Sequence, residues 1–185
     1  MLPSRRGRPT TVARTVTAWS AAPARPVLPR PAGPRVVAVA GPDLDDADLE
    51  VAEVAQAWGG VAMPAAQATR AAVMAALPGA DLVHLAAHGT HQHQSPLFST
   101  VRLADGATFA HELPMAGLAA SHVVLAACEV GRATIRPGDE SLGLTAVLLS
   151  LGVRCVVAPV SRIPDGVARE AMAAYHRLLA DGHDA

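Results

Sequence analysis

The sequence predicts an α/β protein whose mainly parallel β-sheet is covered by helices on both faces, giving three layers. Short runs rich in valine and leucine recur along the chain without alternating with polar residues, which is typical of strands buried on both faces. A segment with helical character lies between each run and the next. Because 51% of the residues are hydrophobic and 3% aromatic, we expect a core of small side chains, alanine above all.

The composition excludes several classes of protein. The high apolar fraction and the net charge of −1 exclude a chain that is disordered throughout. Two cysteines are too few for a disulfide-built secreted scaffold. Uninterrupted apolar runs stay below the roughly 18 residues of a membrane-spanning helix. We therefore expect a cytoplasmic protein that does not act at a membrane.

The N-terminal segment differs in composition from the rest of the chain. Seven of the 15 arginines fall within residues 1–42, which contain no acidic residue, and prolines crowd residues 26–34. Because these arginines are spaced by prolines and have a single aromatic residue, Trp19, among them, they indicate a solvated arm and not a nucleic-acid surface. We predict a basic arm and linker over residues 1–34 and a folded domain over residues 35–185.

The first predicted strand covers residues 36–40 and ends at Gly41-Pro42. A helix with an acidic first turn follows, which suits the positive end of the helix dipole. Gly59-Gly60 ends it. Its apolar face is formed by Val51, Val54, Ala55 and Trp58.

The remaining elements follow from apolar runs and from glycine and proline boundaries. Thr69 is the expected N-cap of the second helix. The last helix is expected to bury Val167, Ala171, Tyr175 and Leu178. The predicted positions are strands at 61–63, 82–87, 122–127 and 155–160, helices at 69–77, 112–118, 142–151 and 167–180, and a small hairpin between 89 and 111.

Two consecutive predicted strands are each followed by a residue whose side chain can take part in catalysis. His88-Gly89 comes after the strand at 82–87, and Cys128 comes after the strand at 122–127. In open α/β sheets, functional groups gather beyond the carboxyl ends of the strands. If these two strands are neighbours, about 4.8 Å apart, both side chains can reach one substrate. The pattern is the one that a thiol nucleophile with a histidine base requires, although position alone favours a buried structural cysteine and a turn histidine.

The chemistry of such a pair is simple. An isolated thiol has a pKa of about 8.5 and is mostly protonated at neutral pH, so a nearby imidazole is needed to accept its proton or stabilise the thiolate. The backbone N–H groups of Gly89 and Cys128 are candidates for an oxyanion hole. The missing side chain of Gly89 would let a substrate carbonyl approach the backbone.

Several segments of the chain resemble the CHAT domain, a branch of the caspase-like cysteine peptidases. The His-Gly pair followed in order by Ala-Cys-Glu is the specific part of this resemblance, which extends over roughly residues 17–181. The segments that carry it are HLAAHG at 84–89, SPLFS at 95–99, LADG at 103–106, VLAACEVG at 124–131, GDESLGL at 138–144 and GVRCVVA at 152–158.

The resemblance implies a caspase-like fold with a catalytic dyad of His88 and Cys128. His84 matches a histidine often found on the preceding strand, with a structural or orienting role. The helix that commonly follows the last segment is missing here, so the domain is expected to be shortened at its C-terminus. CHAT domains usually accompany a repeat-containing or other module, which implies a regulatory protein partner in addition to a protein or peptide substrate.

The charged residues that would select the substrate predict opposite preferences. In caspase-like folds, the pocket for the residue before the cut is walled by the loops after the fourth and fifth strands. The acidic residues in these loops, Glu129, Asp139 and Glu140, would favour a basic substrate residue there. Arg162 would favour an acidic one. The preference stays open, because each of these charges is more often a solvated loop residue than part of such a pocket.

Other chemistries fit less well. Four histidines between residues 84 and 93 have zinc-ligand chemistry, but those at 91 and 93 lie in a polar loop, so we expect no metal. The segment after the first strand lacks the Gly-x-Gly-x-x-Gly pattern of dinucleotide folds, and we expect no cofactor. Cys155 lies inside an apolar run with no base expected nearby, and it is interpreted as a core residue.

The favoured hypothesis is a cysteine endopeptidase that cleaves a protein through an acyl-enzyme. The alternative is a caspase-like interaction module with weak or no turnover, favoured by the shortened C-terminus and the absence of a repeat region.

Overall fold

The computed structural model describes residues 33–90, 92, 95–126, 139–159 and 164–183. Its strands and helices follow one another almost as the sequence predicts. In chain order, they are β1 (Val36–Ala40), α2 (Ala47–Trp58), β2 (Val61–Met63), the 3₁₀ turn η1 (Ala65–Gln67), α3 (Arg70–Ala76), β3 (Leu82–Ala86), β4 (Gly89–Thr90), the 3₁₀ turn η2 (Pro96–Phe98), β5 (Thr100–Leu103), β6 (Gly106–Phe109), α4 (Glu112–Met115), β7 (His122–Leu125), α5 (Asp139–Ser150), β8 (Cys155–Val157) and α6 (Asp165–Ala180).

The main sheet has five parallel strands in the order β2-β1-β3-β7-β8. In β3 and β7, Leu82 pairs with His122 and Leu85 with Leu125, so the two strands that precede the predicted dyad are direct neighbours. A smaller antiparallel sheet is formed by β4, β5 and β6. The predicted parallel α/β architecture is confirmed.

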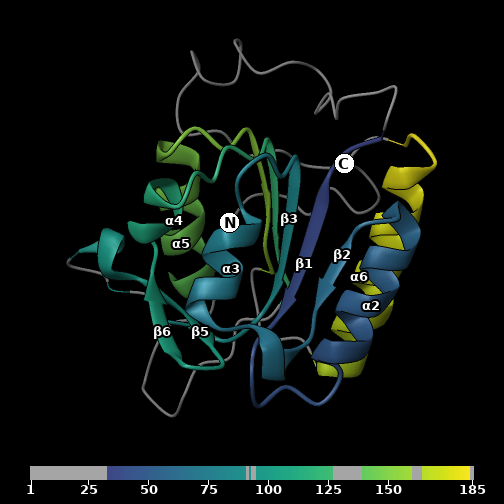
Figure 1. Cartoon of the computed structure of the whole chain (residues 1–185), viewed down its shortest axis with the longest axis horizontal. Helices are drawn as coiled ribbons and strands as arrows, with labels where there is room; N and C mark the ends of the chain where they lie inside the picture. The colour runs from purple at the N-terminus through teal and green to yellow at the C-terminus, as the bar shows by residue number, and fades with distance from the viewer. Residues whose placement is uncertain (1–32, 91, 93–94, 127–138, 160–163, 184–185) are drawn as a thin grey trace, which may run out of the picture.

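Helices cover both faces of the main sheet, as Figure 1 shows, with α2 and α6 on one side and α3, α4 and α5 on the other. Alternate residues of each strand contribute to two separate cores. Val36, Ala38 and Leu82 pack against α2 and α6, whereas Val37 and Val83 pack towards α3 and α5. This division is the reason that the buried strands contain apolar residues at every position.

Helix α2 forms where its apolar spacing predicts. Val51, Val54 and Ala55 are buried against the sheet. Gly59 adopts a left-handed conformation with φ of 62°, and its N–H bonds to the carbonyl oxygen of Ala55. Glycine is favoured at such a helix end because it carries no Cβ. Gly60 fits closely against β1, since a Cβ there would lie 2.7 Å from the carbonyl oxygen of Val36.

The buried face of α6 differs from the prediction. Val167, Ala171 and Leu178 are exposed, and of the predicted set only Tyr175 turns inward. The prediction was wrong because it followed the apolar residues alone, whereas the polar His176, outside the predicted set, is fully buried. The face that packs on the sheet is formed by Ala168, Met172, Tyr175, His176 and Leu179.

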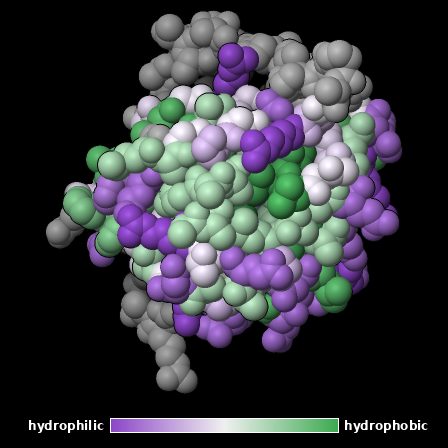
Figure 2. Space-filling view, viewed as in Figure 1, coloured by the Kyte–Doolittle hydropathy of each residue, from purple (hydrophilic) through white to green (hydrophobic). Residues whose placement is uncertain are grey.

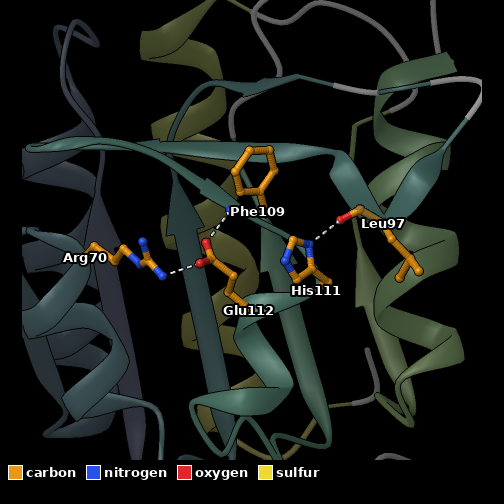
Figure 3. Close-up of polar contacts among 5 residues, drawn as sticks. All are labelled: Arg70, Leu97, Phe109, His111 and Glu112. Atoms are coloured by element: carbon orange, nitrogen blue, oxygen red, sulfur yellow. Dashed lines mark hydrogen bonds and ion pairs between the residues drawn. The ribbon is translucent and has the colours of Figure 1, made fainter.

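The β5–β6 hairpin is joined to the helices beside it by polar contacts (Figure 3). Glu112, at the start of α4, accepts a 2.9 Å hydrogen bond from the N–H of Phe109 and forms an ion pair with Arg70 of α3. His111 hydrogen-bonds to the carbonyl oxygen of Leu97 through Nδ1. These contacts hold the small sheet against the main domain.

The surface in Figure 2 is hydrophilic along the side formed by α2 and α6 and more apolar over the centre of the view. In the part of the chain that the structure describes, no helix has the length and apolar character needed to cross a membrane.

Candidate active site

The order of the main sheet reverses between β1 and β3, because the chain passes from β1 to the edge strand β2 and returns to the other side of β1 as β3. A reversal of this kind opens a crevice beyond the carboxyl ends of the two strands, where open α/β proteins bind ligands. The segments that leave β1 and β3 there are Gly41–Asp43 and Ala87–Gly89. His88, the predicted base, therefore lies at the reversal point.

The imidazole of His88 is held by the backbone of the neighbouring turn. Its Nε2 atom lies 3.0 Å from the carbonyl oxygen of Asp43. A carbonyl oxygen only accepts hydrogen bonds, so Nε2 carries the hydrogen. In the neutral ring, Nδ1 then carries the lone pair and no hydrogen. This bond selects the tautomer in which Nδ1 is the basic atom.

Asp43 is held in an uncommon conformation. Its φ is 64°, and it is the one non-glycine residue with positive φ among those the structure describes. Aspartate tolerates the left-handed region better than most residues. Its carboxylate lies 2.7 Å from the guanidinium of Arg102 on β5. The backbone N–H of Arg102 in turn donates a 2.8 Å hydrogen bond to the carbonyl oxygen of His88.

Gly41 allows these segments to come together. A Cβ at this position would lie 2.5 Å from the Cβ of Ala87 and 2.8 Å from the carbonyl oxygen of Arg102. The N–H of Gly41 donates to the carbonyl oxygen of Ala86. The end of β1, the end of β3 and strand β5 thus meet at a point with no space for a side chain.

His84 lies on β3, four residues before His88. Its side chain is fully buried under the helices α2 and α6. Its Nε2 is 2.7 Å from a carboxylate oxygen of Glu50, and its Nδ1 is 3.0 Å from Nε2 of His176. The indole N–H of Trp58 donates to Nδ1 of His176 over 3.1 Å. Both ring nitrogens of His84 are therefore bonded to protein side chains.

Each of the three hydrogen bonds that link Trp58, His176, His84 and Glu50 has a defined donor and acceptor. An indole N–H only donates, so Nδ1 of His176 accepts and Nε2 of His176 carries the hydrogen. His176 then donates to His84, and His84 donates to Glu50. Burial, with smaller effects from His84 and His122, lowers the pKa of His176 from 6.5 to about 3. We refer to Trp58, His176, His84 and Glu50 as the buried polar chain.

A second cluster, which is partly buried, surrounds Cys155. Nε2 of His122 lies 2.9 Å from the hydroxyl of Tyr175 and 3.9 Å from Sγ of Cys155. The expectation that Cys155 has no base nearby was wrong, because the parallel register pairs it directly with His122. However, burial lowers the pKa of His122 to about 4 and raises the pKa of the Cys155 thiol. Both pKa shifts favour the neutral form, so the imidazole of His122 and the thiol of Cys155 are uncharged near pH 7, as in a structural cluster.

The structure describes some of the predicted site residues. Gly89 is half-buried at the start of β4 and pairs with Val101. Asp139 is the first residue of α5, and its side chain is outside the description. Cys128, Glu129 and Arg162 lie outside the described residues, as do the histidines at 91 and 93. In the remainder of the chain, no three histidine, cysteine or acidic side chains gather as a metal site would require.

Sequence reasoning missed the residues that support His88 and His84. Asp43 and Arg102 come from segments whose proximity depends on the strand order, which the sequence does not state. Glu50 and His176 did carry a signal, because each lies at helical spacing among apolar residues that face the sheet. A polar residue on an otherwise apolar face indicates a buried partner.

The site and the fold define an α/β protein of three layers with a histidine placed at the reversal point of a parallel sheet. The family model for the CHAT domain matches residues 2–185, so the chain belongs to the CHAT domain family. No curated protein matches the chain at a significant level.

Proposed function

We propose that this protein is a cysteine endopeptidase in which Cys128 is the nucleophile and His88 the general base. The observation that carries the proposal is the hydrogen bond from Nε2 of His88 to the carbonyl oxygen of Asp43, since it leaves Nδ1 as the proton acceptor. The membership in the CHAT domain family supports it.

The register of the sheet gives further support. Every residue pair between β3 and β7 differs by 40 in residue number, from Leu82 with His122 to Leu85 with Leu125. His88 and Cys128 also differ by 40. The N–H of Ala126 bonds to the carbonyl oxygen of Leu85, so the pairing extends past the end of β7, two residues before Cys128. Two residues span at most about 7 Å of chain, and this short connection to a strand paired with β3 supports the proposal that Cys128 acts together with His88.

The reaction would proceed in two steps. In the first, Nδ1 of His88 takes the thiol proton while Sγ of Cys128 attacks the carbonyl carbon of the scissile peptide bond. The negative charge on the carbonyl oxygen is stabilised by the backbone N–H groups of Gly89 and Cys128. Collapse of this intermediate breaks the C–N bond, and Nδ1–H protonates the leaving amine. Water then hydrolyses the acyl-enzyme with His88 again acting as base.

A protein or peptide is the proposed substrate, and a regulatory protein, such as one with repeats, is a proposed partner. We place the activity in the cytoplasm, where a reducing environment keeps the Cys128 thiol available.

The test is selective alkylation of the thiols by iodoacetamide near pH 7, followed by mass spectrometry of each cysteine. We expect Cys128 to react faster than Cys155, and the substitution His88→Ala to slow Cys128 by about tenfold or more. His183→Ala is the matched control, because His183 is exposed at the end of α6 and should leave the rate unchanged. Cleavage of a peptide library, abolished by Cys128→Ser, then identifies the reaction.

Equal and slow labelling of both cysteines would contradict the enzymatic proposal. It would favour the interaction module instead.

A further inference from the structure

The strand β5 makes two separate contacts with the segment that carries His88. The backbone N–H of Arg102 binds the carbonyl oxygen of His88, and the guanidinium of Arg102 binds the carboxylate of Asp43. Asp43 itself accepts the hydrogen bond from Nε2 of His88 through its backbone carbonyl. Each of the three residues therefore contacts the other two.

We propose that Arg102 is a positioning residue, which holds the Asp43 carbonyl oxygen where it fixes the tautomer of His88. We refer to the ion pair of Arg102 and Asp43 as the brace. The role of the brace in catalysis rests on the proposed function, whereas its effect on the His88 ring does not.

The conformation of the turn explains why a brace is needed. Pro42 fixes the backbone angle before Asp43, because its ring restricts φ. Asp43 then takes the left-handed conformation that points its carbonyl oxygen at His88. This conformation is less favourable for a residue with a Cβ, so an unrestrained turn would relax towards other angles. The brace tethers the Asp43 side chain to a strand that is itself bonded to His88.

The size of the effect follows from the exposure of the two side chains. Arg102 is 56% exposed and Asp43 62%. Exposed ion pairs are weak and are screened by salt. The brace therefore makes the observed conformation of the turn more favourable, but the turn does not depend on it to form. Its loss should change the orientation of the ring in a folded protein.

The chain contains a matched control for Arg102. Arg70 has the same exposed fraction of 56% and also forms an ion pair, with Glu112. Its other contact is with Asp105 in the hairpin turn, through its backbone N–H. Removing either arginine therefore deletes one equally exposed charge, but only Arg102 contacts Asp43 and His88.

The experiment uses the full chain labelled with ¹⁵N at histidine, at about pH 9, where histidine side chains are ordinarily neutral. The His88 signals are assigned by their loss in His88→Gln. We expect Nε2–H to dominate in the native protein. In Arg102→Met, the ring nitrogens should shift towards a mixture of tautomers, whereas Arg102→Lys should restore most of the native signal and Arg70→Met should not change it.

The same variants are then alkylated at Cys128 as in the functional test. Arg102→Met should slow the reaction by about two- to fivefold, the scale of one exposed ion pair. About 1 M sodium chloride should bring the native protein close to this rate and leave Arg102→Met unchanged. Asp43→Asn is the second variant, because asparagine also accepts left-handed angles while losing the charge. It should behave as Arg102→Met does, with no further loss in the double variant.

An unchanged His88 tautomer in both Arg102→Met and Asp43→Asn would overturn the brace, whatever the alkylation rates are. A shifted tautomer together with alkylation of Cys128 that does not depend on His88 would support the brace and overturn the peptidase proposal. The two failures are therefore distinguishable.

Discussion

Nε2 of His176 lies 3.0 Å from Nδ1 of His84, and the hydrogen between them belongs to His176. This assignment follows because Trp58 already donates to the other nitrogen of His176. The bond joins α6 to β3, and the bond from His84 to Glu50 joins β3 to α2. One line of hydrogen bonds thus ties both helices of this layer to the strand that precedes His88.

Removing the acceptor at the end of this line should destabilise the protein. Glu50→Leu would leave the buried Nε2–H of His84 without its partner. We expect the free energy of unfolding in urea to fall by about 2–3 kcal/mol, since an orphaned buried donor costs that much.

Glu53, one turn later on α2, provides the control. Its carboxylate forms a partly exposed ion pair with Arg169. Glu53→Leu should therefore cost about 1 kcal/mol or less. Equal losses for the two variants would show that the buried polar chain is not a significant source of stability.

The stability should fall in mild acid because of two buried histidines. The pKa of His176 is lowered to about 3 and that of His122 to about 4, both from 6.5, mainly by burial. Below pH 6.5, the unfolded chain binds protons that the folded chain does not, so the free energy of unfolding decreases as the pH falls. Each histidine contributes up to about 1.4 kcal/mol per pH unit, or roughly 4 kcal/mol for the pair at pH 5.

This slope can be assigned by substitution. His122→Gln should reduce the pH dependence of the unfolding free energy between about pH 5 and 6.5, whatever its effect at neutral pH. His183→Gln should retain the native slope, because this side chain is in contact with water in the folded protein. A native slope in His122→Gln would contradict the assignment.

Two glycines near His88 should respond differently to a methyl group. Gly41→Ala would place a Cβ 2.5 Å from Ala87 and 2.8 Å from a backbone oxygen that cannot rotate away. We expect a loss of about 1–3 kcal/mol in thermal or urea unfolding, as for an overpacked core. Gly89→Ala should be tolerated, since its Cβ would have its nearest neighbour at 3.6 Å. An unchanged stability of Gly41→Ala would contradict this prediction, because it would show that the backbone around Gly41 can move enough to accommodate a methyl group.

Cys155 should be unreactive in the folded protein. Burial raises its thiol pKa, so less thiolate is present at any given pH. In Cys128→Ser, alkylation of Cys155 at pH 7–8 should be slow and should accelerate on unfolding in urea. Fast labelling without urea would mean that β8 opens readily.

The strand and helix positions were predictable because apolar runs and turn residues are local signals. The strand at 36–40 and the helix ending at Gly59 agree with the structure to the residue. Hydrophobicity alone did not identify the inward face of α6, because that face includes the polar His176, which is buried through its bonds to Trp58 and His84. Its helical spacing could indicate that His176 is buried, but its partners are 118 and 92 residues away, so no local pattern identifies them.

The candidate site was predictable only in part. The position of His88 at a strand end followed from the sequence, and the adjacency of β3 and β7 is confirmed. The contacts of Asp43 and Arg102 with His88 depend on the order of the strands and on the close approach that Gly41 permits. Side chains brought together by topology leave no periodic signal, which is why these two residues were found only in three dimensions.

Tyr175 and His176 are adjacent in α6 but contact different strands, β7 through His122 and β3 through His84. Neighbouring residues of a helix point about 100° apart. A deletion or insertion of one residue between the start of α6 and Tyr175 would rotate both side chains away from their partners at once. We therefore expect related sequences to keep the length of α6 constant and to confine insertions and deletions to the loops, so that the spacing within this helix evolves more slowly than its exposed residues.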